Sequence, residues 1–485
     1  MENQNVRTME SKRRIEARGT GGTGGTGGTG GTGGNTTGAA VASARTSLGG
    51  LAEWLEKRRL RRSDDDWLTP VREEAARTCA TLGLPARRDE AWKYTNVAPI
   101  ARLAYGPTPN SPNVSAARLA AARLPGVDAL RLVFIAGEFR PELSDLEGVP
   151  PGLVVENLAT AIATRRERLE GVLAQVATTG DRVFSALNTA SFVDGAYIGV
   201  EKNTTVERPI CLEFLSVEAE EPYVSSPRVL IDVGAGASVH VIEDYASLDA
   251  GAVFLENALT EIRVGANAHV EHVKVERTSE RAYHIAAIAL RQASSSTFLS
   301  SSFAIGGALV RNDIHADLDG EGIECTLDGL VLASGSQHID NHTHILHAKP
   351  HCKSWELYKM VLDGKAKGVF SGKIYVAEDA QKTDAKQTNQ TLLLSDTASV
   401  DAKPELEIYA DDVKCTHGAT IGQIDEEALF YLRSRGISAP AARDLLTYAF
   451  ASDIVRRVEV EPLHGAIEAL LLAKLPQSRE LAGSR

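Results

Sequence analysis

Cysteine is scarce in this chain of 485 residues, and its few copies lie far apart. The five cysteines form no C-x-x-C pair: Cys79, Cys211, Cys325, Cys352 and Cys415. An odd and widely spaced set excludes a disulfide framework and predicts a compartment that keeps thiols reduced. We expect Cys211, Cys325 and Cys352 to be structural, because free cysteine is among the most buried residue types.

Long apolar runs and an excess of positive charge are also missing. No apolar stretch reaches the ~20 residues that cross a bilayer, so we expect no membrane partner. The formal net charge of −12 argues against nucleic acid, because phosphate binding needs clustered Lys and Arg. The basic N-terminal residues are not followed by a long apolar segment, which argues against a secretory signal. The expected location is the cytoplasm, with the plastid stroma left open.

Nucleotide-binding and hydrolase motifs are absent as well. Gly372-Lys373 lacks the earlier glycine and the following Ser or Thr of a P-loop. Neither a G-x-S-x-G elbow nor a kinase signature occurs. ATP, if used, must therefore be bound by another subunit.

Composition divides the chain into five expected segments. They are a flexible Gly/Thr-rich tail (1–45), a helical region (46–130), a mixed connecting segment (131–195), a β core (196–422) and a second helical region (423–485). Within them we expect one strand over Leu132–Phe139, a loop and helix over Leu153–Ala177, and a last helix over Ile467–Leu475. Arg88–Thr95 mixes charge with two aromatics, which suits either a docking surface or a turn with Trp92 in the core.

The β core shows a partial repeat. Gly234-Ala-Gly-Ala-Ser-Val resembles Gly265-Ala-Asn-Ala-His-Val, 31 residues later. Phe298 lies 28 residues beyond Val270, and Cys325 lies 27 residues beyond Phe298. A recurring interval of this size, with short strands and frequent turns, favours a β-solenoid. A jelly roll or other sandwich is the competing fold.

A histidine-rich stretch, His338–His351, carries the first candidate site. His342, His344 and His347 suggest a mononuclear metal site in a cupin-like β-fold enzyme. The expected glutamate ligand is missing, because the first Glu after His344 is Glu356, beyond Pro350. The alternative is that these histidines pack along a solenoid face.

Cys415 and His417 form the second candidate site. In a strand, residues i and i+2 point to the same face, so a thiol and an imidazole lie side by side. These ligand types suit zinc or iron–sulfur chemistry, but two are too few for a closed site. A buried cysteine beside a histidine paired with Asp411 or Asp412 is the plainer interpretation.

Six stretches together resemble the SufB/SufD family of iron–sulfur cluster assembly scaffolds. They are Arg88–Thr95, Ala348–Ser354, Leu362–Ile374, Asp379–Gln387, Asp411–Gly422 and Phe430–Ile437. SufB proteins carry a cysteine near the segment that corresponds to Asn389–Asp396, where this chain has leucines. Thr416–Thr420 likewise resembles the SufD branch of the family.

The resemblance implies a fold and a set of partners. The fold would be a right-handed parallel β-helix with helical regions at both ends. The partners would be SufB, as a heterodimer, and two copies of the ATPase SufC docked on the C-terminal helices. The docking candidates there are Leu429, Phe430, Tyr431, Arg433, Arg435, Leu445, Tyr448 and Phe450.

The resemblance also implies that the chain is not an enzyme but a scaffold subunit, and that it carries a cargo. A transient iron–sulfur cluster or iron would lie at the interface with SufB, with His417 as the candidate ligand and Cys415 beside it. The finished cluster would pass to downstream acceptor proteins. No cofactor is expected to bind tightly to the isolated chain.

Overall fold

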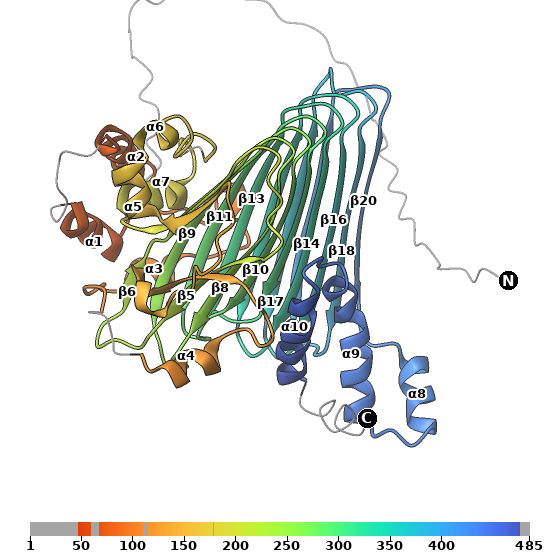
Figure 1. Cartoon of the computed structure of the whole chain (residues 1–485). Helices are drawn as coiled ribbons and strands as arrows, with labels where there is room; N and C mark the ends of the chain where they lie inside the picture. Colours follow the sequence, from red (N-terminus) through yellow and green to blue (C-terminus); the bar gives the residue numbers. More distant parts are fainter. Residues whose placement is uncertain (1–46, 60–66, 110–113, 178, 476–485) are drawn as a thin grey trace, which may run out of the picture. The chain divides into compact units, whose positions relative to one another are not determined.

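The computed structural model of the chain describes residues 47–59, 67–109, 114–177 and 179–475, so the tail expected over 1–45 lies outside them. Helices come first in the described chain, at the red and orange end of Figure 1. They are α1 (Gly50–Arg59), α2 (Thr69–Leu82), α3 (Ala98–Arg102) and α4 (Ala116–Ala122), with a short 3-10 turn at Glu90–Trp92. Gly83 ends α2 with a φ of 61°, a backbone conformation that glycine adopts without strain.

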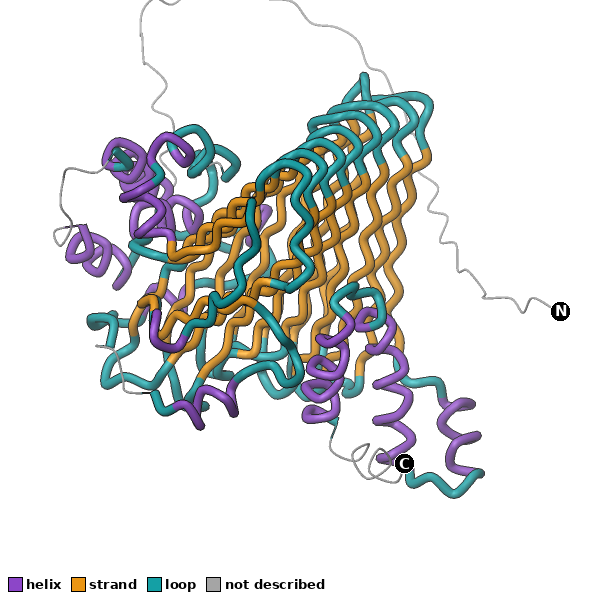
Figure 2. The backbone as a smooth tube through the Cα atoms, in the orientation of Figure 1, coloured by secondary structure: helices purple, strands orange, loops and turns teal. Residues whose placement is uncertain are grey.

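The middle of the chain is a parallel β-solenoid of two ten-stranded sheets, visible as stacked rungs in Figure 2. One sheet contains β5 (Ile210–Ser216), β8 (Ser238–Ser247), β10 (His269–Arg277), β12 (Thr297–Ala304), β14 (Glu324–Ala333), β16 (Lys353–Leu362), β18 (Asp384–Leu393) and β20 (Lys414–Gly422). The other contains β4 (Gly195–Val200), β6 (Tyr223–Ser225), β7 (Arg228–Val233), β9 (Phe254–Val264), β11 (Tyr283–Gln292), β13 (Leu309–Leu318), β15 (His338–His347), β17 (Lys367–Val376) and β19 (Ser399–Ile408). The chain alternates between the sheets, and successive strands of each sheet pair in parallel. The predicted solenoid is confirmed, and the sandwich alternative is wrong.

The repeat intervals in the sequence are the pairing registers of this solenoid. His269 lies opposite Ser238, which is the 31-residue interval. Val270 lies opposite Phe298, and Phe298 opposite Cys325, which are the 28- and 27-residue intervals. In-register parallel pairing stacks residues in columns, so alternate residues of each strand point into a shared interior that is mostly apolar but also holds polar side chains such as His272 and Lys274.

The connecting segment differs from the expectation in three places. The single strand expected over Leu132–Phe139 is a hairpin of β1 (Leu130–Ile135) and β2 (Glu138–Phe139). Ala136 and Gly137 have φ of 51° and 84°, and two consecutive positive φ values make a tight hairpin turn. The loop expected after residue 152 is β3 (Leu153–Asn157), followed by α5 (Leu158–Thr164) and α6 (Arg166–Leu169). Helix α7 (Val183–Ser191) was not expected, because all nine of its residues are buried and its polar side chains, such as Asn188, bond to the chain itself instead of facing solvent.

Arg88–Thr95 lies against the solenoid as a strap. The Arg311 guanidinium of β13 lies 3.8 Å from the Trp92 ring centre and donates to the Ala91 carbonyl (2.8 Å). Thr95 Oγ1 donates to Asp340 Oδ2 of β15 (2.5 Å). Arg311 also pairs with Asp340 at 2.8 Å. The two aromatics of this stretch therefore serve contacts within the chain.

Three helices follow the last strand: α8 (Glu426–Ser434), α9 (Ala439–Val455) and α10 (Glu461–Lys474). Asp425 and Ser438 cap α8 and α9 by accepting backbone N–H groups. The final helix begins six residues earlier than expected, because Pro462 suits a first helical turn. Apolar residues of the helices pack on the outer face of the β10–β16 sheet, where Ile454 and Leu463 belong to the same buried cluster as Val273 and Phe303. Among the described residues, no helix is long and apolar enough to cross a membrane.

Arg311→Met tests the strap. The substitution leaves the Asp340 carboxylate, which is almost fully buried, without its cation. We expect the free energy of unfolding to fall by about 3–5 kcal/mol, the usual result of breaking a buried ion pair. Urea denaturation measures this change. Arg59→Met, which removes an exposed partner of Glu56, should change it little. Equal losses in the two variants would contradict the role of Arg311.

Candidate functional site

Strand β20 places Cys415 and His417 on one face. Cys415 lies opposite Ala385 and His417 opposite Gln387 in the parallel pairing with β18. Ala385 and Gln387 are buried in the interior of the solenoid. Both candidate ligands therefore extend columns that run along the inside of the fold.

The solenoid is open at this end. Among the residues that the structure describes, β20 pairs only with β18, and β19 only with β17. His417 is consequently exposed and Cys415 half-buried. In Figure 1 these strands are the blue edge of the stack, beyond which no further strand is drawn.

Apolar side chains gather around the open end. Six large hydrophobic residues are exposed in the described chain, and three belong to the last rung: Ile408, Tyr409 and Ile421. Two more, Phe430 and Tyr431, lie on α8 directly after it. Monomeric proteins usually protect long strand edges with charge, proline or a covering element. Pro404 does so within β19, whereas the backbone edge of β20 carries no proline.

A buried acid lies two strands beneath His417. Gln387 Nε2 donates to Glu356 Oε2 of β16 at 2.6 Å. Glu356, Gln387 and His417 occupy one register column, on β16, β18 and β20. Burial raises the pKa of Glu356 from 4.5 to about 7, so the column beneath the candidate ligand holds a carboxyl that is partly neutral near neutral pH.

The Cys415 thiol is not activated in this chain alone. Partial burial raises its pKa, and the nearby Asp384 carboxylate acts in the same direction. Because the thiolate is the metal ligand, a cation at this position must supply the charge that favours deprotonation. The other four cysteines are buried, and Cys352 Sγ contacts the Gly320 carbonyl oxygen at 3.1 Å. These four fit structural roles.

The histidine-rich stretch does not assemble into a metal site. His342 and His344 lie on the outer face of β15, where His342 Nε2 is 3.1 Å from Asp340 Oδ1. The His344 ring lies 5.7 Å from the ring of His315 on β13. His347 points inward, and its Nε2 contacts Ser354 Oγ at 2.9 Å. The three side chains that a cupin-like enzyme needs together are divided between two faces of one strand, so that alternative lacks its site.

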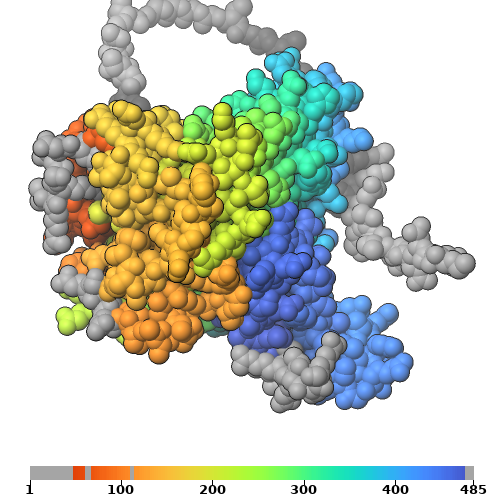
Figure 3. All heavy atoms as spheres, in the orientation of Figure 1, coloured from red at the N-terminus to blue at the C-terminus, as the bar shows by residue number. Residues whose placement is uncertain are grey.

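The candidate docking residues fall into two groups. Phe430 and Tyr431 are 73% and 57% exposed on α8, with the exposed Arg433 and Arg435 nearby. In Figure 3 the blue residues of the C-terminal part lie at the surface. The second group contacts the chain itself. Leu429 is buried, Leu445 is half-buried, the Tyr448 hydroxyl donates to Glu468 (2.8 Å), and Lys359 lies over the Phe450 ring.

The sequence analysis missed one cluster of ligand-type side chains. His240, His269, Glu271 and Glu459 meet where β8, β10 and the linker before α10 come together. The 31-residue interval could have identified part of it, because it places His240 opposite Glu271. Glu459 has no such signal, since its position depends on how the C-terminal helices pack.

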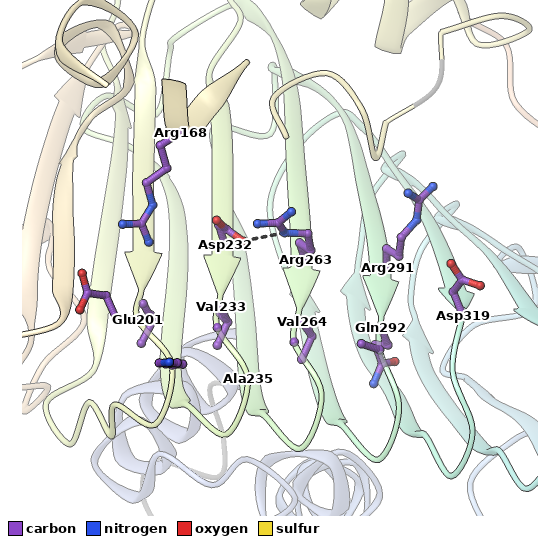
Figure 4. Close-up of a pocket in the computed structure, with 15 residues that line it drawn as sticks. Arg168, Glu201, Asp232, Val233, Ala235, Arg263, Val264, Arg291, Gln292 and Asp319 are labelled. Carbon is purple, nitrogen blue, oxygen red and sulfur yellow. Dashed lines mark hydrogen bonds and ion pairs between the residues drawn. The ribbon is translucent and has the colours of Figure 1, made fainter. Parts of the chain in front are cut away.

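A polar hollow on the outer face of the other sheet is a separate feature. Figure 4 shows Asp232 and Arg263 joined across neighbouring strands, with Arg168, Arg291 and Asp319 around them. The Asp232 and Arg263 side chains are 2.7 Å apart. This ladder of opposite charges stabilises adjacent strands and lies on β7 and β9, many strands away from β20.

Comparison with known proteins gives matches over most of the chain. A family model described as the SUF system FeS cluster assembly SufBD core domain matches residues 215–450, and one for the SufBD protein N-terminal region matches residues 55–212. An iron–sulfur cluster assembly SufBD family protein of Synechocystis sp. is 35% identical over 84% of this chain and 90% of its own length. The iron–sulfur cluster assembly protein SufD of Escherichia coli is 33% identical over 84% of this chain and 93% of its own. The chloroplastic protein ABCI7 of Arabidopsis thaliana is 28% identical over 80% of this chain and 82% of its own length.

Glu356→Gln tests the buried acid. The pKa of Glu356 is about 7 in the folded chain and ordinarily 4.5. The contribution of its neutral carboxyl to the free energy of unfolding is therefore fully present below about pH 4.5 and is lost as the pH rises through about 7. Glutamine does not ionise, so the loss of unfolding free energy between about pH 5 and pH 8 should shrink by roughly 2–3 kcal/mol. Urea denaturation at the two pH values measures it. Glu378 is exposed, so Glu378→Gln should keep the wild-type difference in unfolding free energy between the two pH values. If Glu356→Gln keeps that difference too, the pKa of Glu356 is not raised.

Proposed function

Because the chain belongs to the SufBD family of iron–sulfur cluster assembly proteins, we propose that it is a scaffold subunit that holds a nascent cluster between its open end and a second SufBD-type chain. One observation carries the proposal. The last rung of the solenoid is unpaired within the described residues and presents Cys415 and His417 at its inward face. The cluster is the cargo of this site.

The open end favours a homologous partner, SufB. An unpaired parallel strand is completed by a strand edge of matching spacing and direction, which a second solenoid of the same family supplies. The exposed Ile408, Tyr409 and Ile421 are the apolar contacts that such an interface buries. The E. coli relative named SufD belongs to the branch that the sequence resembles.

The ligand set is divided between the two chains. His417 is the proposed ligand of this chain, with Cys415 beside it, and the partner provides the rest. The Cys415 thiol is protonated in the free chain, so binding of iron and loss of the proton occur together. Separation of the chains removes half of the ligands, which permits transfer of the cluster to an acceptor protein.

The exposed part of α8 is the proposed docking surface for the ATPase SufC. Phe430 and Tyr431 provide aromatic contact area, and Arg433 and Arg435 provide charge. Helix α9, which follows α8, is joined to the solenoid by an ion pair between Asp453 and Lys359 of β16 (2.9 Å). Because β16 pairs with β18 and β18 with β20, movement of the helices has a direct route to the candidate ligands.

The chain itself acts without catalysis in this proposal, and hydrolysis of ATP belongs to SufC. The reduced state expected of its cysteines suits the cytoplasm or the plastid stroma. A metal-dependent enzyme is not favoured by any contact of His342, His344 or His347, because these residues do not converge.

His417→Ala tests the ligand role. In the complex isolated with SufB and SufC, we expect unchanged subunit composition but at least about tenfold weaker retention of iron, because a metal ligand is lost. Anaerobic reconstitution, with iron analysis and visible absorption, measures this. Thr416→Ala, on the outward face of the same strand, is the matched control and should load normally. Normal loading of His417→Ala refutes the ligand role while leaving the partnership intact.

Replacing both Phe430 and Tyr431 by Ser tests the docking surface. We expect the variant to lose SufC but to retain SufB, since truncation of exposed aromatic anchors typically removes about 2 kcal/mol or more each. Co-purification and size-exclusion chromatography separate the two outcomes. Glu426→Gln on the same helix is the control. Conversely, Ile421→Asp should weaken binding of SufB and leave SufC bound. If the variant that lacks both Phe430 and Tyr431 still binds SufC, the assignment of α8 as the docking surface is wrong.

A further inference from the structure

A second group of potential metal ligands lies on the outer face of the solenoid, away from the open end. His240 Nδ1 is 2.9 Å from Glu271 Oε2, and His269 Nε2 is 2.7 Å from Glu459 Oε2. One ligand atom from each of His240, Glu271 and Glu459 lies within 4.8 Å of the others. In the described chain this is the one such group with three or more ligand-type residues.

The fold brings these residues together through two independent elements. Strand pairing sets His240 of β8 opposite Glu271 of β10, and His269 lies two residues before Glu271 on the same face. Glu459 comes from the linker between α9 and α10, and its backbone N–H donates to Glu271 Oε1 at 2.5 Å. The linker thus delivers one carboxylate to a site whose other ligands are held rigidly by the sheet.

Ion pairing alone accounts for some of this geometry, but the donor set has the properties of a metal site. Imidazole and carboxylate donors in this ratio suit divalent ions such as Zn²⁺ and Fe²⁺. Bonds of about 2.0–2.1 Å around a tetrahedral ion set ligand atoms roughly 3.3 Å apart. The His240 and Glu271 atoms are 2.9 Å apart, and the three ligand atoms lie within 4.8 Å of one another, so small side-chain movements bring them to this spacing. Glu271 is 1% exposed, whereas His240, His269 and Glu459 are 25–40% exposed, which gives an ion both a rigid anchor and an entry path.

We propose that His240, Glu271 and Glu459 bind one divalent transition-metal ion, with His269 orienting the Glu459 carboxylate through its Nε2 contact. Binding displaces the proton from His240 Nδ1 to solvent, and the ion takes its place beside Glu271. All of the donors belong to one chain. The ion therefore fastens the α9–α10 linker to β8 and β10, and it does so whether or not the open end carries a cluster.

Zn²⁺ titration of the full-length, untagged chain tests the site, in a His417→Ala, Cys415→Ser background that removes the other ligands of interest. With a competing chelator as indicator, we expect one equivalent of Zn²⁺ to bind. His240→Ala and Glu459→Gln should each weaken this binding at least about tenfold, and His269→Gln, which removes an orienting contact, about 10–100-fold. Anaerobic Fe²⁺ should compete for the same equivalent.

The control separates metal binding from attachment of the helix. Glu280→Gln removes the ion pair of Lys474 on α10 with Glu280 (2.7 Å), which also fastens the C-terminal helices but offers no ligand to this site. Its Zn²⁺ affinity should equal that of the background chain. Hydrogen exchange of residues 457–461 should slow when Zn²⁺ is added, a readout that does not depend on any variant folding. The proposal fails if no equivalent of Zn²⁺ binds, if His240→Ala and Glu459→Gln bind it unchanged, or if exchange in the linker is unaffected.

Discussion

In-register parallel pairing is the constraint on which the rest of this structure depends. Each strand of the solenoid has its backbone groups satisfied by the rung before it and the rung after it, and each inward side chain lies on its counterpart. Because each rung pairs with the rungs on either side, the last rung lacks one neighbour and keeps an unpaired edge and an uncovered interior. In this chain that rung carries Cys415 and His417, and five of the six exposed large hydrophobic residues of the described chain lie on it or on the helix after it.

The same stacked strands form the surface to which the C-terminal helices are attached. Contacts from the end of α9 and the following linker cross one sheet in order: Asp453 reaches Lys359 of β16, Arg457 reaches Asp328 of β14, and Glu459 reaches Glu271 of β10. These attachments lie on the outer face, whereas the candidate cluster ligands lie at the inner face of the last rung. The end of α9 and the linker are therefore fixed to three strands of one sheet, which is hydrogen-bonded strand by strand to β20.

Sequence reasoning identified the elements whose pattern repeats and missed those whose position depends on long-range packing. The intervals between Gly234 and Gly265 and between Phe298 and Cys325 were enough for the solenoid, because parallel register converts sequence distance directly into spatial contact. Helix α7 was missed because its polar side chains, among them Asn188, face buried partners and not solvent. The Arg311 contact with Trp92 joins residues 219 positions apart, and the contribution of Glu459 to its cluster likewise has no local signal. Cys415 and His417 were placed on one face by the period of a strand, but only the sheet order reveals that this face is open.

The two ligand groups of this chain differ in how they are completed, and this difference fits what each has to do. His240, Glu271 and Glu459 come from one chain and are brought together by strand pairing and by the contact of the Glu459 N–H with Glu271, so the proposed ion site is complete without a partner. In the proposed function, Cys415 and His417 supply part of a ligand set that a partner chain completes. Cluster binding is then coupled to subunit association: a cluster that bridges the chains stabilises their interface, and separation of the chains lowers the affinity for the cluster by the same coupling free energy. A scaffold needs this second arrangement at the point of transfer, because tight binding by one chain alone would keep the cargo that it has to release.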